Sequence, residues 1–316
     1  MESGGGGPGE VSSARVVLST GSVYNLALDR AFDLASDCGY DGVEVLVDAR
    51  PDTYDVRYLR RLTKRWRIPI VALHTPFAPR VDGWARSSEK RVEQAVRLAQ
   101  ELGAGIVVAH APLRWHIARV HLYSTLGQRT LQAIIPVRNR AEARYAAWLR
   151  EGLPELEEGS GVRVALENMP AGRMLGRRVR HYRLTTVADC QCWPRLVLDT
   201  THWGTWGMDP TEVFEQLGER VVHVHLSDYD GREHRVPFTG RLKLDRLLAS
   251  LRSWGYRGMV SVELEPGAIA GGSWRQARLG RVLRAVAMRV KMELGAGPSH
   301  SDSATTPHIS RAAEQG

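Results

Sequence analysis

The chain has 316 residues, of which 43% are hydrophobic, and a formal net charge of +8 at pH 7. No apolar run in it approaches the roughly 20 residues that span a bilayer, and no basic segment followed by an apolar stretch marks a signal peptide. We therefore expect a cytoplasmic protein with no membrane partner, and three cysteines (Cys38, Cys190 and Cys192) exclude a disulfide framework.

Eight short apolar runs predict parallel strands in chain order. Runs of β-branched and aliphatic residues are typical of strands that are buried on both faces. The predicted strands are residues 16–20, 42–47, 68–74, 105–110, 162–167, 195–199, 221–226 and 258–264. Helices are predicted at about 26–37, 55–66, 88–102, 139–152 and 274–293. Eight β-then-α units indicate an α/β fold, a (β/α)8 TIM barrel in one domain.

The predicted barrel domain covers residues 14–294, between two tails. Residues 1–13 are rich in Gly and Ser, and residues 295–316 lack an apolar period, so both are expected to be disordered. An open doubly wound sheet is the alternative fold, but no G-x-G-x-x-G follows a predicted strand. Two long connections, 111–140 and 168–186, are expected to cover the active face, because loops that follow barrel strands lie there.

Six of the apolar runs lead into a side chain that binds metals. These side chains are His74, His110, Glu167, Asp199, His225 and Glu263. Neighbouring barrel strands lie about 5 Å apart, so the last four of these residues could share one cation. Three carboxylates and one imidazole suit Mn²⁺, Zn²⁺, Co²⁺ or Mg²⁺. Without a cation, the same buried charges would repel one another.

Further candidates surround this set. They are His74, His110, His202, His234, Glu44 and Asp228. The histidines could bind additional metals, contact substrate hydroxyls or orient the ligands. Glu44 lies between valines, so it must face the barrel mouth or pair with a cation. Asp228 would cap its loop or orient His225, and a short turn after Asp199 would fold His202 back over it.

Arginines and aromatic residues near the same strand ends have two interpretations each. The arginines at 173, 177, 178, 180 and 183 could contact nucleic acid or a phosphorylated substrate, or form a solvated loop. Trp203, Trp206 and Phe77 could stack on a sugar ring or pack in the core.

Together, these residues resemble the xylose-isomerase-like TIM-barrel superfamily over about residues 15–292. The resemblance is carried by DGVE, LHTPF, VVAHAP, LENMP, LDTTHWG, HVHLSD, EHRVPFTG and VSVELEP. For the sugar isomerase and epimerase branch it implies one divalent metal held by Glu167, Asp199, His225 and Glu263. It also implies that the two glutamates transfer protons through an enediolate and that His202 contacts substrate. Arg173 stands where the epimerases have a glutamate, so no role is transferred to it.

For the endonuclease IV branch, the resemblance implies three zinc ions and a wider ligand set. The matching residues are His74, His110, Glu167, Asp199, His202, His225, His234 and Glu263. Arg232 stands where that pattern has an aspartate, with Glu233 next to it, and Phe77 stands where it has a tyrosine.

The sequence therefore predicts a divalent-metal-dependent isomerase or epimerase that acts on a sugar, a sugar phosphate or a related polyol. Arg232 favours this function over the alternative, a zinc-dependent endonuclease IV-like enzyme that hydrolyses DNA at abasic sites. The additional histidines and the positive charge favour the alternative, and a catalytically idle binding protein is a third hypothesis. The expected partner is a small-molecule sugar, with nucleic acid as the partner under the alternative, and assembly into a homo-oligomer stays open.

Overall fold

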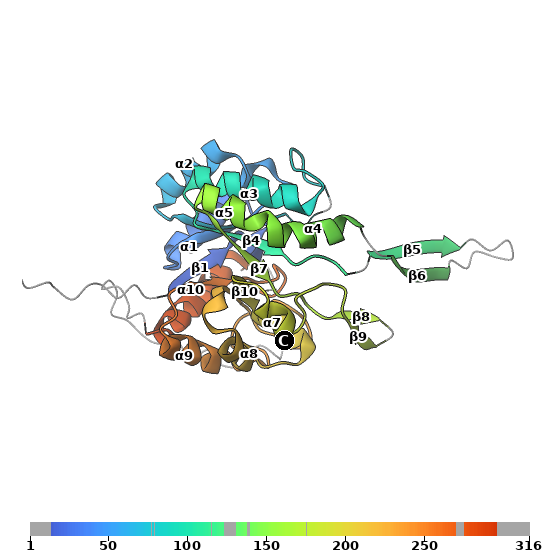
Figure 1. The fold of residues 1–316 in the computed structure, drawn as a ribbon. Helices are drawn as coiled ribbons and strands as arrows, with labels where there is room; N and C mark the ends of the chain where they lie inside the picture. The colour runs from blue at the N-terminus through green and yellow to red at the C-terminus, as the bar shows by residue number, and fades with distance from the viewer. Residues whose placement is uncertain are drawn as a thin grey trace, which may run out of the picture.

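The described residues form a closed barrel of eight parallel strands surrounded by helices (Figure 1). The computed structural model describes residues 14–76, 78, 80–114, 116–122, 131–137, 140–174, 176–269 and 275–295. The barrel strands are β1 (Arg15–Ser19), β2 (Val43–Leu46), β3 (Ile70–His74), β4 (Ile106–His110), β7 (Arg163–Glu167), β10 (Leu196–Asp199), β11 (Val221–Leu226) and β12 (Met259–Val262). Parallel pairing of β1 with β12 closes the barrel. The predicted TIM barrel and its eight strands are confirmed.

The five predicted helices are present, each ending within two residues of its expected bounds. They are α1 (Leu28–Asp37), α2 (Val56–Trp66), α3 (Ser88–Leu102), α4 (Arg140–Glu151) and α10 (Arg275–Glu293). The structure adds α5 (Leu153–Ser160), α6 (Val187–Gln191), α7 (Thr200–Trp206), α8 (Pro210–Leu217), α9 (Leu244–Trp254) and three short 3₁₀ turns, η1 (Thr20–Val23), η2 (Pro51–Thr53) and η3 (Gly218–Arg220). Local chemistry sets several ends: Asp55 caps α2 by accepting from the Tyr58 amide, and α3 stops at Gly103, whose φ is 73°.

The core has two parts, as expected for strands that are buried on both faces. One part lies between the strands and the surrounding helices, where Phe32 and Phe214 are fully buried. The other fills the barrel interior and includes Val17, Ala165 and Val197. The site described below therefore rests on a packed apolar interior.

Two antiparallel hairpins replace the long loops expected after β4 and β7. β5 (His116–Leu122) pairs with β6 (Leu131–Val137), and β8 (Gly172–Met174) pairs with β9 (Arg177–Val179). Both project from the same side of the molecule (Figure 1). The Arg178 guanidinium donates to the Trp206 carbonyl oxygen at 2.8 Å, which ties the arginine-rich hairpin to α7.

Some sequence-based expectations fall elsewhere. The predicted tails, residues 1–13 and 295–316, lie outside the described residues apart from Gly295, and so does Phe77. Cys38 and Cys190 are buried, Cys192 is exposed, and all three are free thiols. Within the described part of the chain, every helix is too short or too polar to cross a membrane.

Candidate active site

Four residues from adjacent strands converge at one end of the barrel. Glu167 and Asp199 end β7 and β10, His225 lies near the end of β11, and Glu263 directly follows β12. Each offers one ligand atom that lies within 4.8 Å of the others. His225 Nδ1 is 2.8 Å from Glu263 Oε2, 3.0 Å from Glu167 Oε1 and 3.9 Å from Asp199 Oδ2. The structure therefore brings together the inner set that the sequence suggested.

Asp199 is held in place from both sides. It is the N-cap of α7, because its Oδ1 accepts from the His202 amide at 2.7 Å. Asn168 clamps its backbone: Asn168 Oδ1 accepts from the Asp199 amide at 2.7 Å, and Nδ2 donates to the Asp199 carbonyl oxygen at 3.2 Å. The expected short turn after Asp199 is thus wrong, since a helix begins there. This helix directs Oδ1 to the cap and leaves Oδ2 for the cluster.

The chemistry of the donor set fits a divalent cation. Asp199 Oδ2 is buried and has no hydrogen-bond partner among the described residues. A buried carboxylate oxygen without a partner is costly unless something positive completes it. Three carboxylates and one imidazole nitrogen are ligands that Mn²⁺, Mg²⁺, Co²⁺ and Zn²⁺ accept.

Burial and neighbouring charges shift the pKa values of all four residues. Burial raises the pKa of Asp199 from its ordinary 3.8 to about 8. Burial also acts on Glu167 and Glu263, but His225 outweighs it, so the pKa of Glu167 is lowered well below its ordinary value and that of Glu263 falls to about 2. The pKa of His225 is raised well above its ordinary value because Glu263, Glu44 and Glu167 outweigh its burial. A cation would displace the protons of Asp199 and His225 on binding.

The outer histidines form two further groups with the same carboxylates. His74 Nε2 and His110 Nε2 lie 3.5 and 3.2 Å from Glu167 Oε2. His202 and His234 gather with Asp199, and their rings meet edge to face at a centroid distance of 5.4 Å. All four histidines thus line the site, and each group of three could hold a cation of its own.

Two residues that departed from the endonuclease pattern occupy different surroundings. The Arg232 side chain is 71% exposed and pairs with Asp230 at 3.1 Å, so it stays out of the cluster. Glu233, next to it, brings Oε2 to 3.9 Å from His202 Nε2. A carboxylate therefore does approach the group of Asp199, His202 and His234, although its position in the sequence is shifted.

The aromatic residues near α7 divide between packing and anchoring. Trp203 is fully buried, so its ring belongs to the core rather than to a surface for a sugar. The Trp206 indole donates to the Met169 carbonyl oxygen at 3.0 Å, which fastens α7 to the segment after β7.

Asp228 fixes the loop that follows β11. Its carboxylate is buried and accepts from three backbone amides, those of Tyr229, Gly240 and Leu242, at 2.7, 2.8 and 3.0 Å. A Cβ added at Gly240 would lie 2.3 Å from Asp228 Oδ1, so glycine is needed for this approach. Asp228 therefore closes the loop that carries Glu233 and His234.

Replacing Asp228 with alanine should lower the free energy of unfolding by about 2–4 kcal/mol, because three backbone amides lose the buried, charged acceptor that they share. Urea unfolding followed by circular dichroism measures this change. The matched control is Asp230→Ala, which removes a partly exposed ion pair and should cost less than about 1 kcal/mol. Equal losses in the two variants would contradict the assigned role of Asp228.

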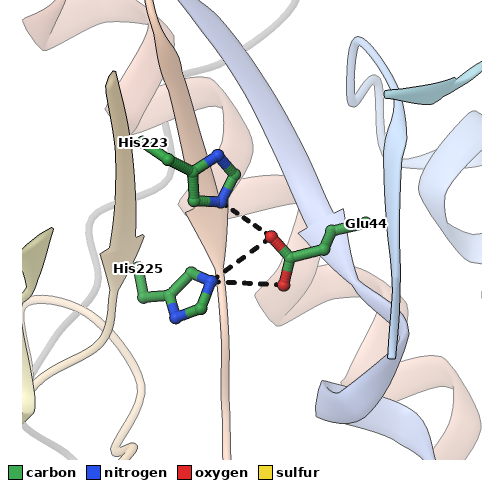
Figure 2. Close-up of side chains that lie close together, drawn as sticks. All are labelled: Glu44, His223 and His225. Carbon is green, nitrogen blue, oxygen red and sulfur yellow. Dashed lines mark hydrogen bonds and ion pairs between the residues drawn. The ribbon is translucent and has the colours of Figure 1, made fainter. Parts of the chain in front are cut away.

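Glu44 lies inside the barrel, facing two histidines of β11 (Figure 2). Its carboxylate is 2.7 Å from His223 Nε2 and 3.2 Å from His225 Nε2, and all three side chains are fully buried. Despite burial, His225 and His223 lower the pKa of Glu44 well below its ordinary value. Sequence reasoning missed His223 and Asn168. The alternation in VVHVHL was the available signal for His223, because residues two apart share a strand face.

The sequence matches a known family of barrel proteins. Residues 32–282 match the model of the family described as xylose isomerase-like TIM barrel. The chain belongs to this family.

Individual relatives share less than a third of their aligned residues with this chain. A protein of Mycobacterium leprae named as uncharacterized is 29% identical over 290 residues, covering 84% of this chain and 94% of the relative. Fructoselysine 3-epimerase of Escherichia coli O157:H7 is 22% identical over 264 residues, covering 76% and 86%. The crystal structure of D-psicose 3-epimerase in the presence of D-fructose has a TM-score of 0.63 at 16% identity and covers 89% of this chain and 99% of the other. The structural likeness shows the shared fold.

Proposed function

We propose that the protein is a divalent-metal-dependent epimerase or isomerase of a ketose, a ketose phosphate or a related polyol. The observation that carries this proposal is the position of two glutamates in one cluster. Glu167 ends β7 and Glu263 directly follows β12, the two strands that flank β10 and β11 in the barrel, and both side chains reach His225 Nδ1. Two carboxylates that enter from opposite sides suit removal of a proton from one face of a carbon and its return to the other.

A cation held by Glu167, Asp199, His225 and Glu263 would polarise the oxygens of a bound ketose and acidify the adjacent C–H. One of the two glutamates would take the proton from carbon, leaving an enediolate, and the other, which has to carry a proton on its carboxyl group when the substrate binds, would give that proton to the opposite face of the carbon. The His110 and Glu263 side chains are 31% and 17% exposed, so they meet substrate at the mouth. The more deeply buried His74 and His202 orient its hydroxyls. The relative named fructoselysine 3-epimerase supports a ketose as the substrate class.

Metal content and proton exchange test this function together. We expect about one Mn²⁺, Co²⁺ or Zn²⁺ per chain by elemental analysis, because one complete four-ligand group is present. Incubated with a panel of ketoses and keto-inositols in D₂O, the loaded protein should incorporate deuterium next to the carbonyl carbon of its substrate, as seen by NMR. A loaded protein that exchanges no carbon-bound proton across the panel would contradict the proposal.

The additional histidine groups favour a second candidate, a zinc-dependent endonuclease acting at abasic sites in DNA. His74, His110 and Glu167 form one further group of possible ligands, and Asp199, His202 and His234 form another. Under this function, elemental analysis should find close to three zinc ions per chain. Incision of a duplex with an abasic site, lost on chelation, would replace the epimerase proposal.

A further inference from the structure

A buried carboxylate lies behind the imidazole of the candidate metal ligand His225. His225 Nε2 is 3.2 Å from Glu44 Oε1 and 3.3 Å from Glu44 Oε2. His223 Nε2 is 2.7 Å from the same oxygen, Glu44 Oε2. Figure 2 shows both rings, which come from β11, pointing toward the carboxylate that Glu44 extends from β2.

The two nitrogens of His225 face different surroundings. Nδ1 faces Glu167 and Glu263 at 3.0 and 2.8 Å, whereas Nε2 faces Glu44. A neutral imidazole carries one N–H and one lone pair, and the hydrogen bond made by one nitrogen decides which nitrogen can bind a metal. An N–H at Nε2 that donates to Glu44 leaves the Nδ1 lone pair directed into the ligand cluster.

Burying the Glu44 carboxylate costs free energy, and a role in orienting His225 would account for that cost. Its side chain is 0% exposed and lies in a barrel interior filled elsewhere by residues such as Val17 and Val197. Taking a carboxylate out of water is unfavourable unless charged or polar partners compensate. Here the partners are two imidazoles, and no arginine or lysine among the described residues forms an ion pair with Glu44. An apolar side chain would fill the same space at lower cost.

We propose that Glu44 is a positioning residue for the metal site: it fixes the ring and the tautomer of His225 so that Nδ1 binds the cation, and His223 holds Glu44 in place. This inference rests on the proposed metal-dependent function. Groups that hold a ligand histidine by its second nitrogen orient it and increase its basicity, and their loss weakens metal binding.

The test compares Glu44→Gln with the wild-type protein. The glutamine keeps the size of the side chain but loses the charge and one acceptor, so affinity for Zn²⁺ should fall by about 10–100-fold in competition with a chromophoric chelator. The visible absorption bands of the Co²⁺-loaded protein should shift as well. The matched control is Ser261→Ala. Ser261 is a fully buried β12 residue that lies in register with His225, and its hydroxyl forms no hydrogen bond with any described residue. It should leave both readouts unchanged.

The outcomes separate the inference from the proposed function. If wild-type protein binds Zn²⁺ and Glu44→Gln binds it equally with the same Co²⁺ bands, the inference is overturned and the metal-dependent function stands. If wild-type protein binds no metal, both are overturned. Should Glu44→Gln fail to fold, NMR of ¹⁵N-histidine-labelled, Zn²⁺-loaded wild-type protein decides. A proton on His225 Nε2 with Nδ1 bound to the metal supports the inference, and the reverse tautomer excludes it.

Discussion

Replacing Glu263 with glutamine should abolish exchange of substrate carbon-bound protons with solvent, with kcat reduced by about 10²–10⁴-fold. The amide is the same size as the carboxylate but cannot accept a proton from carbon. The measurement is deuterium incorporation by NMR with the Mn²⁺-loaded protein and the ketose that the wild type turns over. Since Glu263 also stands among the metal ligands, the metal content of the variant has to be determined in the same sample.

The matched control is Glu265→Gln, which makes the same chemical change at an exposed side chain two residues further along. It should retain wild-type exchange. If Glu263→Gln holds its metal and its fold yet exchanges protons as fast as Glu265→Gln, Glu263 is not an acid or base. Glu167→Gln should also abolish exchange. If one variant loses exchange mainly with one epimer and the other variant mainly with the other epimer, the result shows which glutamate acts on which face of the carbon.

The barrel and the convergence of four strand-end side chains could be predicted because both follow from short-range patterns. Buried parallel strands appear as apolar runs, and parallel topology places their last residues at one end. Glu167 and Asp199, at the ends of β7 and β10, therefore lie together. The same argument placed His225 and Glu263 beside them, and the resemblance to a family implied the same four residues.

The contact between Glu44 and His223 and the helix after Asp199 could not be predicted, because they depend on strand register and tertiary contacts. Glu44 and His223 meet across the interior, from β2 and β11, which are separated by β1 and β12 in the barrel order. No local pattern reports such a contact. The segment after Asp199, TTHWGTW, has weak intrinsic helix propensity, yet it forms α7 because Asp199 caps it and Trp203 is buried beneath it.

Asp199→Asn should be more stable than the wild-type protein without metal and less stable than it with metal. Without metal, the variant should be the more stable one, because Asp199 must take up a proton to remain buried. Its pKa is raised from 3.8 to about 8, so the folded state binds more protons than the unfolded state in this range, and stability falls as pH rises through it. Each pKa unit corresponds to about 1.4 kcal/mol, so the destabilisation is on the order of 5 kcal/mol above pH 8.

Urea unfolding in EDTA at several pH values measures the difference between the two proteins. It should be small near pH 4, widen up to about pH 8 and then level off. In excess Zn²⁺ near pH 6 the order should invert, because the metal-free difference there is about 3 kcal/mol, whereas a ligand at 1,000 times its dissociation constant adds about 4 kcal/mol to the protein that binds it. The asparagine keeps an oxygen for the His202 amide but loses a charged ligand, so it gains less from metal. If the variant is less stable than wild type both in EDTA and in Zn²⁺, the main contribution of Asp199 is to cap α7. If instead the wild-type protein is the less stable one without metal and the more stable one with Zn²⁺, Asp199 lowers the stability of the metal-free protein and contributes to binding of the cation.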